Sequence, residues 1–459
     1  MKILKFIRFV LCAGGILILL LCILLFFTSR GPYRNIKVDV TLPSDENWKD
    51  SSPLEVGVGV KDITPDLSQY DTWTDVDNDG SFNPELDRYE DRNNNGEFDF
   101  VWLAGFGNSR PAQGINDPLW SRAIAFRNNG ITVVLVSIDS VGITHERYIG
   151  IRKRLSKLNV DIDLVSFACT HTHNAPDTIG LWSYKELIGR RFDEKYMELL
   201  DDRIVGSVIE AVENLAPATT TIAEAKVPID NFSYDSRPPF IVDQKLPLAW
   251  FKNALTGQTI ATLASWGMHP EGFGSKFTKV SSDFVHYFRE AMEKGLDGKE
   301  GFNGFGGKSV FFTGPVGGLM TQLNIDITDR FGVKHGRQGK SKAQGENLAI
   351  LAANQLNRAN LEGLGIMESQ RLAFSAKTIY LPIGWPLKAP VALGLLHPGL
   401  YGLPFKTKVK TEINAVRIGD IEIITSPGEM FPEIIDGGIE SPLGADIKTD
   451  PIEIPPLRK

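Results

Sequence analysis

The chain has 459 residues, 42% of them hydrophobic and 23% charged, with a formal net charge of −7. This length and composition are typical of a globular protein with an ample core, and they exclude a disordered or coiled-coil chain. Lysines and arginines form no long basic block, so nucleic-acid binding is not expected.

The N-terminal segment is the most apolar part of the chain. About twenty mostly apolar residues, Phe9 to Thr28, follow three basic ones, Lys2, Lys5 and Arg8, and such a run is long enough to span a bilayer. We therefore expect a transmembrane signal anchor over residues 1–29 and a polar linker over residues 30–54. A cleaved signal peptide is the alternative. The membrane is thus an expected partner, through this helix.

Three cysteines are present, and two of them lie in the apolar segment. Cys169 is therefore alone in the body, so no disulfide is expected there.

Residues 55–459 have the pattern of a single large α/β domain. Residues 130–144, "GITVVLVSIDSVGIT", form a continuous apolar run, which indicates a buried strand. A helical pattern follows over 145–158, and a second buried strand is predicted within 160–173. Strand, helix and strand in this order require a crossover connection, so part of the sheet is expected to be parallel.

Further elements are predicted along the rest of the chain. Strands are expected at 54–60, 219–227, 259–268, 308–314 and 414–429, and helices at 184–214, 282–294 and 340–359. Residues 382–406 are rich in Pro, Gly and Leu, and we interpret them as a loop or lid. The apolar stretch 381–405 could line a lipid-facing entrance, with an ordinary buried loop as the alternative.

Two acidic loops within residues 71–100 resemble the first half of a calcium loop. "DVDNDG" and "DRNNNG" each alternate oxygen-bearing side chains and end in Gly, and the ligand candidates are Asp75, Asp77, Asp79, Asp91, Asn93 and Asn95. Leu86 and Trp102 occupy the twelfth positions, where an EF-hand has Glu, so these are not ordinary EF-hands. Solvated turns without an ion are the alternative. Calcium loops favour a body outside the cytoplasm, either periplasmic or extracellular.

Two of the chain's seven histidines, His171 and His173, lie one residue apart at the end of a predicted strand. Residues i and i+2 of a strand face the same side, and the carboxyl end of such a strand borders the usual ligand crevice. Two imidazoles there suit zinc. A hydrogen-bonded structural pair is the alternative.

Three further polar residues follow apolar strands in the same way. His269 comes after "LASWGM", Glu429 after "IEIITSPG" and Asp139 after "VLVSI". Two histidines and a carboxylate, with one position open for water, compose a catalytic zinc site.

Several motifs together resemble the neutral/alkaline non-lysosomal ceramidase family. They are "GVGVKDITP", "AGFG", "THTHNAPD", "SWGMHPEG", "SSDF" and "SPGEMFPE", in this order over roughly residues 55 to 435. The resemblance implies a layered αββα-like fold, with mixed β-sheets flanked by helices. It also implies a zinc-dependent activity that hydrolyses the amide of ceramide to a sphingoid base and a fatty acid.

Carried over by motif, His171 and His269 resemble the zinc histidines of the family, and Glu429 resembles the zinc carboxylate. His173 lies beside them as a group that orients a ligand or handles a proton, and Asp139 is a second candidate to carry the proton. Arg237, in "DSRPPF", resembles an arginine that holds the substrate amide, with a surface turn as the alternative.

The sequence departs from the family pattern at two places. Gly317 stands where the family has a serine, so we expect direct attack by water activated by zinc. The family also has a tyrosine ligand downstream of "PGE", and no tyrosine follows Tyr401 here. We expect no C-terminal immunoglobulin-like domain.

These departures leave two alternatives to a ceramidase. One is a zinc hydrolase of the same fold that acts on another amide, ester or lactone. The other is a membrane-anchored binding protein with weak catalysis.

Overall fold

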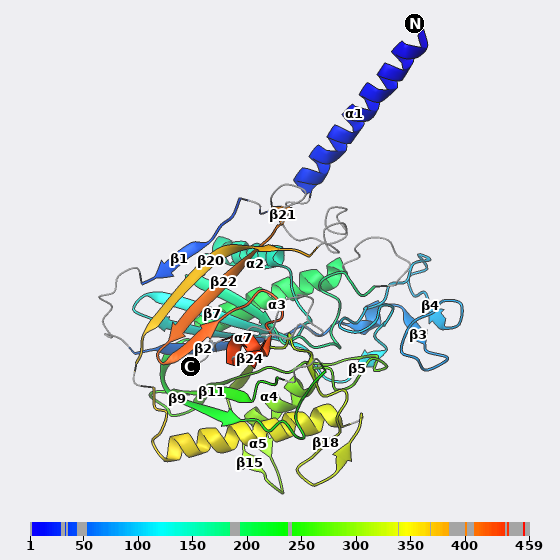
Figure 1. Cartoon of the computed structure of the whole chain (residues 1–459). Helices are drawn as coiled ribbons and strands as arrows, with labels where there is room; N and C mark the ends of the chain where they lie inside the picture. The colour runs from blue at the N-terminus through cyan, green and yellow to red at the C-terminus, as the bar shows by residue number, and fades with distance from the viewer. Residues whose placement is uncertain are drawn as a thin grey trace.

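A computed structural model describes most of the chain, and Figure 1 shows its course. The described residues are 2–28, 33, 35–43, 53–183, 193–236, 241–337, 339–367, 369–384, 400–401, 408–436, 438–439 and 453–454. Most of the predicted lid, 382–406, therefore lies outside the described residues, as do residues 184–192 of the predicted long helix.

A mixed eight-stranded sheet forms the centre of the domain. Its strand order is β16-β12-β11-β9-β2-β6-β7-β8. The strands are β2 (Glu55–Asp62), β6 (Trp120–Asn128), β7 (Ile131–Ile138), β8 (Leu164–Cys169), β9 (Ala216–Lys226), β11 (Lys245–Asn253), β12 (Thr259–Trp266) and β16 (Lys308–Thr313). β7 and β8 are parallel, as are β12 and β16. The predicted crossover between β7 and β8 is thereby confirmed, because helix α2 (His145–Lys157) connects them.

A second sheet packs against one face of the first. It is antiparallel and consists of β1 (Asp39–Leu42), β20 (Leu372–Pro382), β21 (Leu400–Tyr401), β22 (Lys408–Ile418) and β23 (Ile421–Ile424). Phe374 and Val416 of this sheet share an apolar cluster with Ile124 and Phe251 of the large sheet. Residues 30–54 are therefore more than a linker, since β1 lies within them and pairs with β20.

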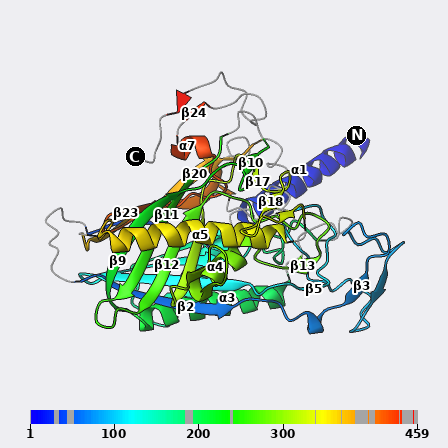
Figure 2. The ribbon, with the colours of Figure 1, turned by 90° about the horizontal axis from the view of Figure 1, so that it is seen from below.

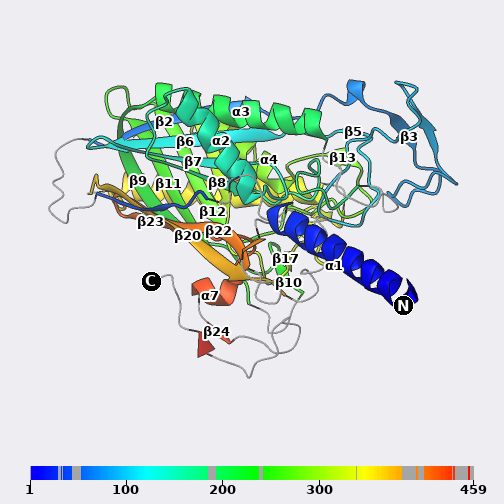
Figure 3. The ribbon, with the colours of Figure 1, turned by 90° about the horizontal axis from the view of Figure 1, so that it is seen from above.

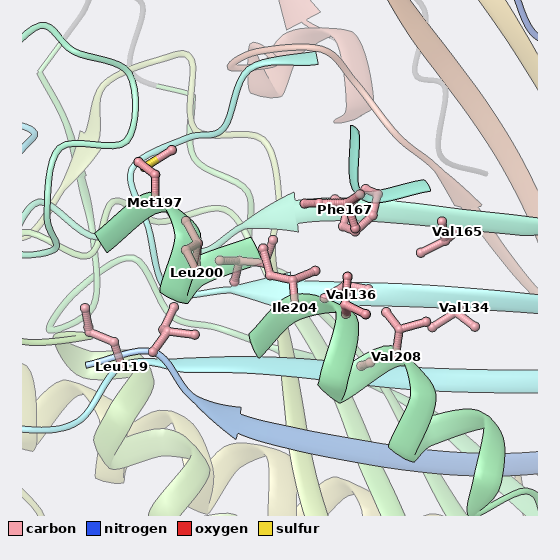
Figure 4. Close-up of a cluster of buried hydrophobic side chains, with 14 of the residues drawn as sticks. Leu119, Val134, Val136, Val165, Phe167, Met197, Leu200, Ile204 and Val208 are labelled. Carbon is pink, nitrogen blue, oxygen red and sulfur yellow. The ribbon is translucent and has the colours of Figure 1, made fainter. Parts of the chain in front are cut away.

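Four helices cover the other face of the large sheet. α2 and α3 (Glu194–Glu213) lie over β6, β7 and β8, and Figure 3 shows them on the side opposite β20 and β22. Figure 4 shows Leu200, Ile204 and Val208 of α3 pointing towards Val134 and Val136 of β7. Each such buried aliphatic side chain contributes about 1.5–3 kcal/mol.

The remaining helices cover the other half of the same face. α4 (Phe284–Lys294) and α5 (Lys340–Leu361) share a cluster with β11, β12 and β16. Figure 2 shows α5 lying across β9, β11 and β12. The described residues thus form three layers, helices, large sheet and small sheet, so the predicted mixed α/β class is confirmed as a single domain. These three layers, one of helices and two of sheets, correspond to the first three layers of the predicted αββα arrangement.

The other described elements are short. They are η1 (Leu67–Gln69), β3 (Thr72–Thr74), β4 (Arg88–Glu90), β5 (Gly114–Ile115), β10 (Tyr234–Asp235), β13 (Lys279–Val280), β14 (Gly295–Leu296), β15 (Phe302–Asn303), β17 (Met320–Thr321), β18 (Ile327–Thr328), β19 (Lys334–His335), α7 (Pro432–Asp436), β24 (Gly438–Ile439) and β25 (Glu453–Ile454).

Helix α1 (Lys2–Thr28) extends away from the domain (Figure 1). Among the described residues, no helix combines the length and apolar character that a membrane span needs. The structure therefore gives no support to the transmembrane segment predicted over residues 1–29.

The large sheet curls so that its two edges contact each other. Ser137 of β7 donates a hydrogen bond to the carbonyl oxygen of Phe311 in β16 at 2.6 Å. Arg122 of β6 donates to the carbonyl oxygen of Ser309 at 2.8 Å and also pairs with Glu293. These polar contacts join strands that stand at or near opposite ends of the strand order.

A buried ion pair completes the junction between the edges. Asp139, which follows β7, accepts two hydrogen bonds from Arg289 of α4, at 3.0 and 2.6 Å. Its carboxylate also accepts from Trp120 N at 2.8 Å. Both side chains are almost fully buried, at 0% and 1% exposure. Removal of either charge would leave the other buried without a partner, which is energetically costly.

Replacement of Asp139 by Asn is expected to leave the guanidinium of Arg289 buried and uncompensated. Loss of one partner of a buried pair costs about 3–5 kcal/mol, so the free energy of unfolding should fall by that amount in a denaturant titration. Glu290→Gln is the matched control, because Glu290 pairs on the same helix with Lys294, whose side chain is 72% exposed. The control should change stability by less than about 1 kcal/mol. Equal effects of the two substitutions would contradict this assignment.

Candidate metal centre

His171 and His173 lie in the segment that follows β8. The backbone N–H of His171 donates to Ser140 O, and its ring Nδ1 lies 2.6 Å from Val141 O. Because a carbonyl oxygen only accepts, Nδ1 carries the proton and Nε2 is left with a lone pair. His171 has a φ of 67°, so it turns the chain sharply at the end of the strand. The residues just after Asp139 thus hold the first histidine in place.

His269 approaches from the other edge of the curled sheet. It follows β12, and both its backbone N–H and its ring Nδ1 lie at hydrogen-bonding distance from Met320 O, at 3.2 and 2.9 Å. The same reasoning leaves Nε2 of His269 with a lone pair.

Glu429 lies between these two histidines, in the segment from β23 to α7. Its carboxylate oxygens are 3.4 Å from His171 Nε2 and 3.6 Å from His269 Nε2. Its side chain is 43% exposed, whereas that of His269 is 5% exposed, so Glu429 forms the solvent side of the cluster.

The three imidazoles converge. Their ring centroids are 5.0 to 5.5 Å apart, and one ring nitrogen of each lies within 4.8 Å of the others. The predicted residues His171, His173, His269 and Glu429 are therefore brought together by the fold.

The "AGFG" motif forms one wall of this cluster. Gly105 has a φ of 98°, and a Cβ atom there would come within 2.3 Å of the His173 ring. Phe106 contacts the same ring edge-to-face, with the centroids 5.0 Å apart. Arg110 is buried and donates to the carbonyl oxygens of Ala104 and Phe277, at 3.2 and 2.9 Å. Burial lowers the pKa of Arg110 to about 10, so the guanidinium stays charged at neutral pH.

Glu271 is a site residue that the sequence analysis missed. Its carboxylate lies 3.1 Å from His173 Nδ1, but the geometry is not that of a hydrogen bond. Both side chains are only 10% exposed. The signal was available in "SWGMHPEG", where Glu271 stands two residues after His269. A carboxylate in such a motif orients a histidine as readily as it binds metal.

The charges of the cluster depend on one another. The close approach of His171 and His269 holds the pKa of the Glu429 carboxyl well below its usual range. Burial lowers the pKa of His269, but Glu429 and Glu271 raise it by more, so it ends above its usual value. Burial lowers the pKa of His173, and this effect outweighs that of Glu271. Burial raises the pKa of Glu271, but contact with His173 lowers it by more.

The donor set fits a zinc ion. Zinc takes imidazole nitrogen and carboxylate oxygen at roughly 2.0–2.2 Å, so two ligand atoms of a tetrahedral site stand about 3.4 Å apart. The nitrogen-to-oxygen distances of 3.4 and 3.6 Å between Glu429 and the two histidines match this spacing. Protein acceptors already occupy the opposite ring nitrogens, as is usual for metal-bound histidines.

The other two predicted catalytic residues stand apart from this cluster. Both oxygens of Asp139 accept hydrogen bonds from Arg289, which favours a structural role over proton transfer. Arg237 lies outside the described residues.

Gly317 lies against the segment that carries Glu429. Its N–H donates to Met430 O at 2.8 Å, and a Cβ atom on Gly317 would come within 3.0 Å of the carbonyl oxygen of Glu429. The position that resembles the family serine therefore supports the Glu429 backbone here. It has no room for a larger residue unless that segment moves.

The first acidic loop brings together a different set of carboxylates from the one predicted. Asp75, Asp77 and Asp87 each place an oxygen within 4.8 Å of the others, and Asp79 is not among them. In the second loop, Asp91 accepts from Gly96 N at 2.8 Å, and Asn93 and Asn95 donate to Asp99. Calcium binding by these loops stays a prediction.

The "SSDF" motif supports the histidine segment through hydrogen bonds. Thr172 donates its hydroxyl to Ser281 O at 2.8 Å, and Ser281 N donates to Asn174 O at 2.9 Å. Asp283 then accepts from Phe284 N at 2.6 Å at the start of α4. Asp283 is fully buried, and this burial raises its pKa to about 7.

The stability of the protein should therefore depend on the protonation of Asp283. The folded state holds this proton up to about pH 7, whereas an unfolded aspartate loses it near pH 3.8, so rising pH between these values destabilises the fold. The side chain of the Asp283→Asn variant does not titrate, so this position no longer makes stability depend on pH. Its stability relative to the wild type should rise over this interval, by on the order of 4 kcal/mol, and level off above it. Denaturant titrations of both proteins from pH 4 to pH 8 measure this difference, and a constant difference would refute the expectation.

The comparisons with known proteins agree with the motifs. The family model "Neutral/alkaline non-lysosomal ceramidase, N-terminal" matches residues 95–314, which include His171, His173 and His269. A comparison with curated proteins gives no match.

Solved structures of ceramidases share the fold. "Ceramidase complexed with C2" has a TM-score of 0.57 at 16% identity and covers 82% of this chain and 63% of its own. The "neutral ceramidase from Pseudomonas aeruginosa" has a TM-score of 0.58 at 18% identity and covers 82% of this chain and 62% of its own. The chain thus spans less than two thirds of either structure. The resemblance that the motifs predicted is confirmed: residues 95–314 match the model of the N-terminal domain of the neutral/alkaline ceramidase family, and the solved ceramidase structures share the fold.

Proposed function

We propose that the protein is a zinc-dependent amidohydrolase that cleaves the N-acyl amide of ceramide-like sphingolipids and releases a sphingoid base and a fatty acid. The observation that carries the proposal is the convergence of His171, His269 and Glu429 from three separate segments, with distances that suit one zinc ion. The family match and the shared fold support the choice of an amide substrate.

His171 and His269 would bind the ion through Nε2, and Glu429 through a carboxylate oxygen. A bound zinc supplies Lewis acidity, which polarises the amide carbonyl and lowers the pKa of water. His173 lies beside these groups, and the sequence predicts that it carries a proton. The exposed side of the cluster, where Glu429 lies, is the side from which a lipid amide could reach it.

Direct attack by water fits the environment of Gly317. A serine nucleophile is absent at this position, and the nearby hydroxyl of Thr313 donates to Thr170 O at 2.7 Å. Thr321 is 5% exposed and accepts from Leu323 N at 2.9 Å. Both threonines therefore have local structural partners.

Two alternatives stand beside this proposal. The first is a zinc hydrolase of the same fold that acts on another amide, ester or lactone. The second is a membrane-anchored binding protein with weak catalysis. We also propose, from the N-terminal apolar segment and the acidic loops, that the domain lies outside the cytoplasm.

Hydrolysis of a fluorescent ceramide by the purified, zinc-loaded full chain tests the proposal. We expect turnover that His269→Ala reduces to background, because the variant lacks one zinc ligand. A parallel panel of N-acyl amides, esters and lactones covers the alternative hydrolase. No turnover of ceramide by a protein that still binds zinc stoichiometrically would refute the ceramidase assignment.

Gly317→Ser tests whether the missing serine can be restored. The added Cβ would displace the Glu429 segment, so we expect turnover to fall, on the order of 100-fold for a shift of about 1 Å. Gly317→Ala is the matched control, because it adds the same Cβ without a hydroxyl, and it should lose as much activity. A gain of activity in the serine variant alone would show that a nucleophile at this position is productive.

A further inference from the structure

A buried lysine, Lys340, lies at the start of α5 and takes no part in the proposed mechanism. The residue is only 1% exposed, and its ammonium donates to the carbonyl oxygens of Gln322 and Leu323, at 2.8 and 3.3 Å. Lysine is almost never fully buried without partners, because burial penalises its charge and lowers its pKa. The ammonium therefore serves to fix the backbone of residues 322 and 323.

The segment that Lys340 holds contacts His269 on two sides. Met320 O lies at hydrogen-bonding distance from both the backbone N–H and the ring Nδ1 of His269, at 3.2 and 2.9 Å. The buried amide of Gln322 satisfies its neighbours in one orientation, in which it donates to His269 O at 2.8 Å and accepts from Gly272 N at 2.9 Å. Residues 320–322 thus fix the His269 ring and both ends of the loop 269–272.

The same loop packs directly against the first turn of α5. A Cβ atom on Gly272 would come within 2.6 Å of the Ser341 hydroxyl oxygen and within 2.9 Å of the Gln322 amide nitrogen. Ser341 follows Lys340 in the helix, and both are almost fully buried. Closely packed interiors transmit a displacement to their neighbours, so a shift of residues 320–323 would reach His269.

We propose that Lys340 is a positioning residue that acts through Gln322 and holds His269 in the orientation in which its Nε2 binds zinc. This inference rests on the zinc of the proposed function and keeps the ligands His171, His269 and Glu429. Lys340 itself contacts neither the ion nor the substrate. Without its ammonium, two buried carbonyl groups would lose their donor, and the segment that supports His269 would shift.

Zinc affinity of the purified full chain, measured by competition with a chromogenic chelator, tests the proposal. Lys340→Met removes the ammonium and keeps an apolar stem, and it should weaken zinc binding about 10- to 100-fold, as expected for a group that supports a ligand. Gln322→Met should have an effect of the same size. The double variant should bind zinc no more weakly than the weaker single variant, because the two residues act along one path.

The visible spectrum of the Co²⁺-substituted protein gives a second readout that does not depend on activity. It should differ from that of the wild type in both single variants, because a reoriented His269 changes the ligand field. A general loss of stability would not by itself alter the spectrum of the folded protein.

Lys410→Met is the matched control for the loss of a buried lysine. Lys410 is 4% exposed and also donates to two backbone carbonyl oxygens, those of Tyr33, at 3.2 Å, and Ile36. These acceptors lie in the segment that follows α1, so the variant should lose stability but keep the zinc affinity and the Co²⁺ spectrum of the wild type.

Wild-type zinc affinity and Co²⁺ spectrum in Lys340→Met would overturn this inference alone, as would an equal loss of affinity in Lys410→Met. Additive losses in the double variant would overturn the path through Gln322. If Lys340→Met fails to fold, Gln322→Met decides the question, and wild-type zinc affinity there would overturn the inference. Absence of zinc binding in the wild type would overturn the proposed function as well.

Discussion

The contact between the two edges of the large sheet is the constraint on which the site depends. His171 and His173 follow β8 at one end of the strand order, whereas His269 follows β12, next to β16 at the other end. In a flat sheet these residues would be separated by the width of several strands. The hydrogen bonds of Ser137 to Phe311 and of Thr313 to Thr170, with the Asp139–Arg289 pair, hold the edges together. The candidate metal centre lies across that junction.

Asp139 illustrates how a buried charge supports a site without taking part in its chemistry. Its carboxylate accepts hydrogen bonds from Arg289, from Trp120 N and from the Thr170 hydroxyl. The two residues that follow it, Ser140 and Val141, supply the carbonyl oxygens that position His171. A substitution at Asp139 would therefore act on His171 through the backbone, and loss of activity there would not identify a proton carrier.

Glycines replace side chains where the cluster needs close packing. Gly105 lets the "AGFG" loop lie directly on the His173 ring, and Gly317 lets the chain approach the Glu429 segment. Both positions belong to motifs that resemble the ceramidase family.

Local sequence patterns predicted the main strands and helices of the domain and the residue types of the candidate metal centre. Periodic apolar runs predicted β7, α2 and β8, and the polar residues at the ends of strands predicted His171, His269 and Glu429, because these patterns are local. It also predicted a helix across residues 145–158 within one residue of α2. Three contacts could be seen only in the folded chain: Asp139 with Arg289, Glu271 with His173, and Gly317 with the Glu429 segment. These contacts join residues more than ninety positions apart, and their formation depends on how the sheet curls, which no local pattern specifies.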